Sequence, residues 1–189
     1  MNMKRLFIAI KIHPDQQFLD CLGEMKSLLR HEKIKWVEEQ NIHSTLKFLG
    51  DTETKKIPGI EQALVPVAEQ HLKFSLWLNK LGIFGSRYDP RVIWVGIDPY
   101  DELVSLMQKV HKSLEVCGFE TDRQNLVPHL TLGRIKELKD KALFQKIIEQ
   151  FRQIGSVKMD IDRMILYESI LKKEGPTYVA LKTFSLRQS

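Results

Sequence analysis

One short motif occurs twice in the sequence and contains residues that can transfer protons. It reads His-x-Thr-Leu, first at His43 and again at His129. Two imidazoles with ordinary pKa values near about 6.5 can be present as one neutral base and one charged acid around neutral pH. Phosphodiester hydrolysis needs this combination, because a base deprotonates the attacking water while an acid protonates the departing sugar oxygen. The repeated motif therefore predicts a two-histidine catalytic site.

Each motif lies in a segment predicted to be a strand, residues 43–49 and 129–134. In a strand, residues i and i+2 project from one face, so each histidine shares a face with its threonine, Thr45 or Thr131. The leucines then face the apolar interior. The threonine hydroxyls can donate hydrogen bonds to non-bridging phosphate oxygens, and a nearby arginine can neutralise their charge. Arg134 is the candidate arginine.

The elements that position these residues follow from hydrophobic patterning. Strands are predicted at residues 6–10, 34–37, 43–49, 74–79, 92–97, 129–134, 157–162 and 178–184. Amphipathic helices are predicted at residues 15–30, 57–67, 103–117 and 144–151. Pro66 should kink or shorten the second helix. A loop is expected at residues 82–86, a left-handed C-terminal residue at Gly118, and the end of the fourth helix at Gly155.

The order of these elements favours an α+β fold with largely antiparallel sheets. Strands come singly and in pairs between helices, and no Gly-rich turn links a strand to a helix, as a doubly wound parallel sheet would require. The 189 residues contain no linker, so we expect one domain, residues 1–189. Because each motif is followed by an amphipathic helix, we expect two similar lobes whose histidines meet across a cleft.

Composition limits the possible partners and locations. The net charge of +5 and the pI near 9.1 favour an anionic partner such as nucleic acid, although many basic proteins bind none. The basic residues are scattered, which fits a local anion site better than a broad duplex-binding face. No apolar stretch approaches about 20 residues and no signal peptide is evident, so we expect a cytoplasmic protein. Cys21 and Cys117 are predicted to be small core residues.

Other residues with chemical potential have ordinary interpretations. Four further histidines are expected to be surface groups: His13, His31, His71 and His111. Neither motif has the paired histidines or adjoining carboxylates of hydrolytic zinc sites, so no metal is expected. Phe48, Trp36 and Phe84 can stack on a terminal base, but core packing is the favoured interpretation. Strict alternation places Phe48 on the face of Leu46, away from His43.

The two motifs and their flanking residues resemble those of the 2H phosphoesterase superfamily. Residues 43–50 (His-Ser-Thr-Leu-Lys-Phe-Leu-Gly) and 129–134 (His-Leu-Thr-Leu-Gly-Arg) are similar to motifs of the bacterial and archaeal RNA 2′,3′-cyclic phosphodiesterases, historically called 2′-5′ RNA ligases. The likeness spans the whole chain, including residues 5–10, 90–96, 167–169 and 178.

The resemblance implies a bilobal, pseudo-symmetric fold, with largely antiparallel sheets lining a central cleft and helices outside. It implies hydrolysis of the terminal 2′,3′-cyclic phosphate of an RNA to a 2′-phosphate, without metal or cofactor. His43 would donate the proton and His129 would accept one, a choice that the residues alone leave open. Arg134 would contact the phosphate, although strict alternation puts it on the face opposite His129 unless the chain turns at Gly133.

Three alternatives to this function stay open at this point. Other 2H activities use the same two histidines, namely hydrolysis of small cyclic phosphates of nucleotide metabolites and 2′-5′ ligation of tRNA halves. A non-catalytic RNA-binding module would use a basic cleft without turnover. For the leading hypothesis we expect a monomer acting on RNA ends that carry a cyclic phosphate, among them tRNA fragments.

Overall fold

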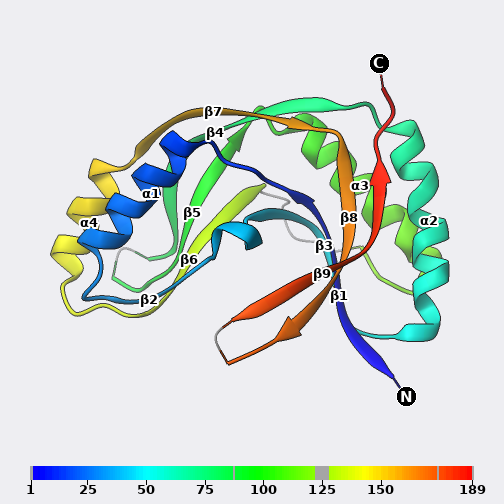
Figure 1. Cartoon of the computed structure of the whole chain (residues 1–189), viewed down its shortest axis with the longest axis horizontal. Coiled ribbons are helices and arrows are strands. Elements are labelled where there is room, and N and C mark those ends of the chain that lie inside the picture. Colours follow the sequence, from blue (N-terminus) through cyan, green and yellow to red (C-terminus); the bar gives the residue numbers. More distant parts are fainter. Residues whose placement is uncertain (1, 87, 122–127, 174, 189) are drawn as a thin grey trace.

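The computed structural model describes residues 2–86, 88–121, 128–173 and 175–188, which form two antiparallel β-sheets and four α-helices. Two helices lie together at each end of the molecule, with the sheets between them (Figure 1). Helices α1 and α4 occupy one end, and α2 and α3 the other. The helices are α1 (Gln16–Leu28), α2 (Ile57–Gln70), α3 (Asp101–Leu114) and α4 (Lys141–Gln150). Short 3₁₀ turns are η1 (Glu39–Asn41), η2 (Thr54–Lys56) and η3 (Glu115–Cys117).

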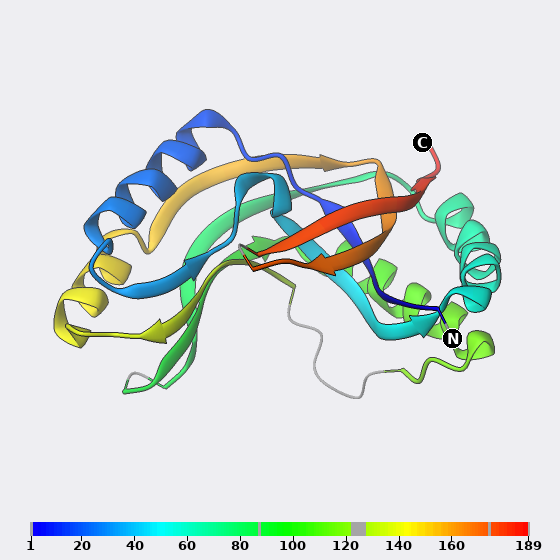
Figure 2. The same ribbon diagram turned by 60° about the horizontal axis from the view of Figure 1, so that its bottom comes forward.

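The first sheet has four strands in the order β3-β1-β8-β9. Its strands are β1 (Met3–Lys11), β3 (His43–Glu53), β8 (Arg163–Leu171) and β9 (Pro176–Ser185). All neighbouring pairs are antiparallel. The hairpin of β8 and β9 extends across the middle of the molecule toward the second sheet (Figure 2). Strand β3, which contains the first motif, is an edge strand.

The second sheet has five strands in the order β2-β6-β5-β4-β7. Its strands are β2 (Lys33–Trp36), β4 (Phe74–Gly85), β5 (Pro90–Asp98), β6 (His129–Glu137) and β7 (Gln153–Ile161). These pairs are antiparallel as well. Strand β6 contains the second motif and lies between β2 and β5. The two motifs therefore belong to different sheets, as the expectation of two facing halves requires.

An aspartate caps the start of two helices, and all four helices pack through their apolar stripes. Asp15 caps α1 by accepting a hydrogen bond from the backbone N–H of Phe18, and Asp140 caps α4 by accepting one from that of Leu143. Gly118 ends η3 with a φ of 81°, the left-handed conformation that glycine adopts without steric cost. The apolar stripes of all four helices join the inward faces of both sheets in one buried cluster.

Several element boundaries differ from the predictions. Strand β8 was not predicted, although its residues 164–167 are buried, because it is a mixed run without clear alternation. Pro66 does not shorten α2, which continues to Gln70. Helix α4 ends at Gln150, and Gly155 lies within β7 instead of ending the helix. The expected loop at residues 82–86 is largely strand, since β4 continues to Gly85.

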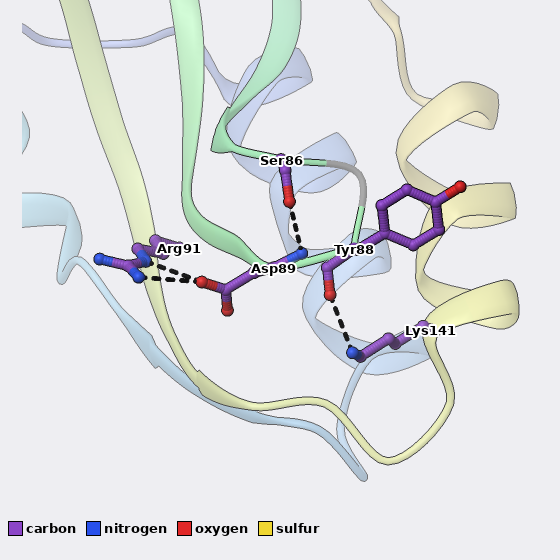
Figure 3. Close-up of polar contacts among 5 residues, drawn as sticks. All are labelled: Ser86, Tyr88, Asp89, Arg91 and Lys141. Atoms are coloured by element: carbon purple, nitrogen blue, oxygen red, sulfur yellow. Dashed lines mark hydrogen bonds and ion pairs between the residues drawn. The ribbon is translucent and has the colours of Figure 1, made fainter.

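The turn between β4 and β5 is joined to the start of α4. The backbone N–H of Asp89 donates to Oγ of Ser86 at 3.0 Å, and Arg91 forms an ion pair with Asp89 (Figure 3). Nζ of Lys141, the first residue of α4, donates to the backbone oxygen of Tyr88 at 2.8 Å (Figure 3). These contacts hold the far end of β4, whose residue Phe84 lies beside the second motif histidine.

Candidate active site

The two repeated motifs line one cavity between the sheets. The cavity has a volume of about 670 Å³, and its wall includes His43, Thr45, His129, Thr131 and Arg134. Strand β2 and the β8–β9 hairpin supply further parts of the wall, so both sheets contribute. All five site residues predicted from the sequence thus lie around the same cavity.

Within each motif the side chains alternate as predicted. The histidines and threonines are partly exposed. The residues that alternate with them are at most 1% exposed: Ser44, Leu46, Leu130 and Leu132. The leucines join the buried cluster that the helices cover, which anchors each motif to the interior. The prediction that each strand presents an imidazole and a hydroxyl on one face is confirmed.

His43 is held by one hydrogen bond and two aromatic contacts. Its Nδ1 lies 2.6 Å from the backbone oxygen of Asn41, and because a carbonyl can only accept, Nδ1 donates. The ring of Tyr178 meets the His43 ring edge-on, with centroids 5.1 Å apart and planes at 88°. Phe7 lies 5.2 Å away. Since Nδ1 is engaged in this bond, Nε2 is the nitrogen left to exchange a proton with a substrate.

The surroundings of His43 favour its neutral form in the unliganded protein. Burial lowers the pKa of His43, because the charged imidazolium loses hydration. The hydrogen bond to the Asn41 carbonyl opposes this lowering, and the positive charge of Lys11 adds to it. Lys11 is the cross-strand partner of His43 on β1, and its ammonium donates to the backbone oxygen of Gln40.

His129 has similar aromatic support from the other sheet. The ring of Phe84 meets it edge-on, with centroids 4.8 Å apart and planes at 85°. Trp94 stacks on Phe84 at 5.1 Å and lies 6.3 Å from the histidine ring. Gly82 leaves the room that the indole occupies, since a Cβ there would lie 2.4 Å from it. Phe84 reaches this position because β4 continues through the residues predicted to be a loop.

A β-bulge brings Arg134 into the cavity. The pairing of β6 with β5 passes from Thr131 to Gly133 and skips Leu132, which is therefore an extra residue on β6. After a bulge the alternation changes phase, so Arg134 returns to the face of Thr131. The positive charge of Arg134 acts on Tyr178 of the opposite sheet. Burial raises the pKa of Tyr178, and the positive charges of Arg134 and Arg5 oppose that rise. The bulge thus removes the conflict between strict alternation and the predicted phosphate contact.

A matching bulge affects Phe48. The pairing of β3 with β1 skips Leu46, the residue equivalent to the bulged leucine of β6. Phe48 therefore lines the cavity with His43 and is 55% exposed, so the prediction that it lies on the Leu46 face is wrong. Lys47 takes the opposite face instead, where it is 4% exposed and donates from Nζ to the backbone oxygen of Glu120 at 2.7 Å.

Both bulged leucines keep a hydrogen bond on their carbonyl. The oxygen of Leu132 accepts from the backbone N–H of Val37 at 2.8 Å, in continuation of the β2–β6 pairing. Strand β3 is an edge strand and has no such neighbour, and here the ring of His111 on α3 contacts the oxygen of Leu46 through Nε2 at 2.9 Å. A side chain of helix α3 thus makes with the Leu46 carbonyl the contact that a backbone N–H makes with the Leu132 carbonyl. This bond satisfies a carbonyl that the bulge leaves without a strand partner.

Two of the four histidines expected at the surface are buried. His111 is 1% exposed and His71 is 2% exposed, so the surface prediction is wrong for both. Nδ1 of His71 lies 3.2 Å from the ammonium of Lys109, and its ring packs edge-on against Phe74. Burial lowers the pKa of His71, with Lys109 adding to the effect and Glu102 opposing it. Both histidines join α3 to other elements and lie outside the cavity wall.

Asn41 and Tyr178 contribute to the site although neither was predicted from the sequence to have a role in it. Nδ2 of Asn41 donates to the backbone oxygen of Pro176 at 3.0 Å, which ties η1 to the β8–β9 hairpin. The same asparagine accepts from His43, and Tyr178 lies two residues beyond Pro176 on β9. An asparagine two residues before a motif histidine is a weak signal for such a link. Nothing local marks Tyr178, because it comes from the far end of the chain.

Among residues 2–86, 88–121, 128–173 and 175–188, no group of three or more His, Cys, Asp or Glu side chains could hold a metal ion. Cys21 and Cys117 are free thiols and partly buried. No helix within these same ranges is long and apolar enough to cross a membrane.

Comparison with known proteins identifies the class to which this fold belongs. LigT of E. coli superposes with a TM-score of 0.77 at 22% identity, covering 99% of this chain and 100% of that one. A protein of Thermus thermophilus superposes with a TM-score of 0.76 at 22% identity, covering 97% and 98%. The α+β fold with two open antiparallel sheets is therefore that of the LigT-like phosphoesterases, and the predicted fold class is confirmed.

Sequence comparison gives the family. Residues 14–172 match the model of the 2′-5′ RNA ligase superfamily. A protein of Thermotoga maritima is 32% identical over 94% of this chain and 92% of its own, and one of Methanocaldococcus jannaschii is 30% identical over 94% and 98%. Both are named RNA 2′,3′-cyclic phosphodiesterase. The chain belongs to the 2′-5′ RNA ligase superfamily, which confirms the resemblance to the 2H phosphoesterases.

Proposed function

We propose that this chain is an RNA 2′,3′-cyclic phosphodiesterase that opens the terminal cyclic phosphate of an RNA to a 2′-phosphate. The observation that carries the proposal is that His43 and His129, from two different sheets, line one cavity together with Arg134. Relatives that match nearly the full chain are named for this activity. The net charge of +5 suits an anionic substrate.

The proposed chemistry assigns a role to each residue. One histidine removes a proton from a water molecule, which attacks phosphorus, and the bond from phosphorus to the 3′ oxygen breaks. The other histidine protonates that 3′ oxygen, leaving a 3′ hydroxyl and a 2′-phosphate. Thr45 and Thr131 donate hydrogen bonds to the non-bridging oxygens, and Arg134 neutralises their growing negative charge. Because two histidines supply both proton steps, the proposal requires no metal or cofactor.

The proposal follows the resemblance in making His43 the donor and His129 the acceptor. Burial lowers the pKa of His43, so a donor there must take up its proton when the substrate binds. A phosphate carries negative charge, and a nearby opposite charge favours the imidazolium. The assignment of His43 as the proton donor therefore requires that the pKa of His43 rise when a phosphate occupies the cavity. A titration of His43 by NMR, with and without inorganic phosphate, checks this requirement.

The decisive experiment uses an oligonucleotide that ends in a 2′,3′-cyclic phosphate, with EDTA present. The wild-type protein should produce only the 2′-phosphate. His43→Ala and His129→Ala should each lower kcat by about 10²-fold or more. His31→Ala, which changes an exposed histidine outside the cavity wall, is the matched control and should keep full activity. If the wild-type protein opens no cyclic phosphate, the proposal is wrong and a non-catalytic RNA-binding module takes its place.

The proposal extends to the source of the substrate and the working state of the protein. We assign the activity to a cytoplasmic monomer acting on RNA ends that carry a cyclic phosphate, among them tRNA fragments. Three substrates separate the related activities: the cyclic-phosphate oligonucleotide, a 2′,3′-cyclic mononucleotide and a cyclic ADP-ribose phosphate. An RNA-end phosphodiesterase should show the highest kcat/KM on the oligonucleotide. Joining of tRNA halves, measured in the same preparation, would reveal ligation.

A further inference from the structure

Three cationic side chains line the cavity, and the protein does not neutralise them. Lys35, Arg134 and Lys172 belong to the cavity wall, whereas the one carboxylate among the described wall residues is that of Glu38. All three cations are exposed. Within the part of the chain that the structure describes, none of the three forms an ion pair with a carboxylate. The cavity wall therefore has positive charge available for an anionic ligand.

Lys35 lies directly across from Arg134 on the neighbouring strand. The pairing of β2 with β6 makes the Cα atoms of these two residues partners. Side chains of such a pair share a face of the sheet, where like charges are destabilising. A cyclic phosphate carries one negative charge, which Arg134 alone can neutralise. The positive charge of Lys35 is therefore in excess of what the reacting phosphate requires.

Lys172 lies near Lys35 but comes from the other sheet. It follows the end of β8 in the turn of the β8–β9 hairpin, where its backbone N–H donates to the oxygen of Gly175 at 3.1 Å. A Cβ at Gly175 would lie 3.9 Å from Cε of Lys35, so the Lys35 side chain extends from β2 to this turn. The hydrogen bond from Asn41 to the oxygen of Pro176 holds the hairpin here. Lys35 and Lys172, the lysine pair, thus lie where β2 meets the hairpin.

We infer that the lysine pair binds the phosphodiester on the 5′ side of the terminal nucleotide, and so makes the site prefer an RNA end to a cyclic mononucleotide. This inference rests on the proposed function and extends it to the choice of substrate. An RNA end brings a second phosphate beside the cyclic one, whereas a cyclic mononucleotide does not. The cavity of about 670 Å³ falls in the range that holds ligands well beyond the size of one phosphate. Phosphate contacts carry no sequence information, so any terminal base should be accepted.

Binding measurements test the inference without turnover. The probes are adenosine 2′-monophosphate and adenosine 2′,5′-bisphosphate, which differ only in the 5′-phosphate that represents the internucleotide phosphodiester. Wild type should bind the bisphosphate about 10-fold tighter or more. Lys35→Gln and Lys172→Gln should each weaken bisphosphate binding by about 10-fold and monophosphate binding by less than about 2-fold. Lys35→Arg keeps the charge and should keep the wild-type preference.

A matched control and the salt dependence make the test specific. Lys182→Gln removes the same charge from an exposed lysine of β9 that lies outside the cavity wall, and it should bind both probes as wild type does. Each phosphate contact to a single strand contributes about 0.7 to the slope of log affinity against log salt concentration. For a dinucleotide that ends in a 2′-phosphate, this slope should become shallower by about 0.7 in Lys35→Gln and stay unchanged in Lys182→Gln.

The outcomes separate this inference from the proposed function. If wild type binds the two probes equally, the inference is wrong, and a wild-type affinity ratio in either glutamine variant refutes the role of that lysine. With cyclic-phosphate substrates, each variant should raise KM for the oligonucleotide and keep kcat, because a contact away from the reacting phosphorus binds substrate and transition state alike. A wild-type protein without turnover would refute the proposed function, and the titrations would still decide whether the lysine pair binds a second phosphate.

Discussion

Replacing Gly82 by alanine should displace the ring of His129 through the aromatic rings that pack against it. The added Cβ would lie 2.4 Å from Cζ2 and 2.7 Å from Cε2 of Trp94, closer than the 3.0 Å that real Cβ contacts respect. The indole must therefore move by more than half an ångström, and it is stacked on Phe84 at 5.1 Å. Phe84 in turn contacts His129 at 4.8 Å. The displacement should pass through the rings of Trp94 and Phe84 to the imidazole of His129, which we propose to be the base.

The size of the effect follows from the clash. Forcing one extra methyl into a packed site costs about 1–3 kcal/mol. For a protein of this length each kcal/mol lowers Tm by about 2–4 °C, so Gly82→Ala should lower Tm by about 2–12 °C. A misplacement of about 1 Å can cost 10²-fold in rate, and we expect kcat to fall by about 10- to 100-fold.

Thermal denaturation and steady-state kinetics measure the two effects, and two further variants make the test specific. Gly23→Ala is the control, because nothing lies within 4 Å of a Cβ there and alanine in helix α1 should stabilise by about 0.5–1 kcal/mol. Trp94→Phe removes part of the clashing indole. This substitution removes no hydrogen bond, since Nε1 of Trp94 is buried without a partner among the described residues. Gly82→Ala should therefore cost less in the Trp94→Phe background. Wild-type Tm and kcat in Gly82→Ala alone would refute the reasoning.

Three further predictions follow from the site. The pKa of His43 should lie below 6.5 in an NMR titration of the free protein, and the free energy of unfolding should fall as the pH drops below 6.5, because the unfolded chain takes up that proton first. A value above 6.5 would contradict the burial argument. Arg134→Met should lower kcat/KM by about 10- to 100-fold with little change in Tm, since the side chain is exposed; an unchanged kcat/KM would exclude a phosphate contact. His111→Leu should lower the free energy of unfolding in urea by about 1–3 kcal/mol, because it leaves the Leu46 carbonyl buried and unpaired, and His111→Gln should cost less; equal losses would contradict this.

Local patterns in the sequence determined the motif strands and most helices. Side-chain alternation has a period of two, so the burial of Leu46 and Leu130 opposite the histidines follows from spacing alone. Helices α1 and α3 follow from apolar residues three and four apart, and the cap at Asp15 from a side chain that bonds within its own turn. These features depend on residues close together in the chain, which is why the sequence suffices for them.

The tertiary structure decided everything that depends on register and on distant partners. A bulge exists only relative to a paired strand, so the sequence of β3 could not show that Phe48 would face the cavity, nor that of β6 that Arg134 would. His111 is buried because an edge strand leaves a carbonyl for it to meet. Likewise Tyr178 contacts His43 although 135 residues separate them, because sheet pairing between distant segments brings them together. Spacing along one strand contains no information about what the neighbouring strand will place beside it.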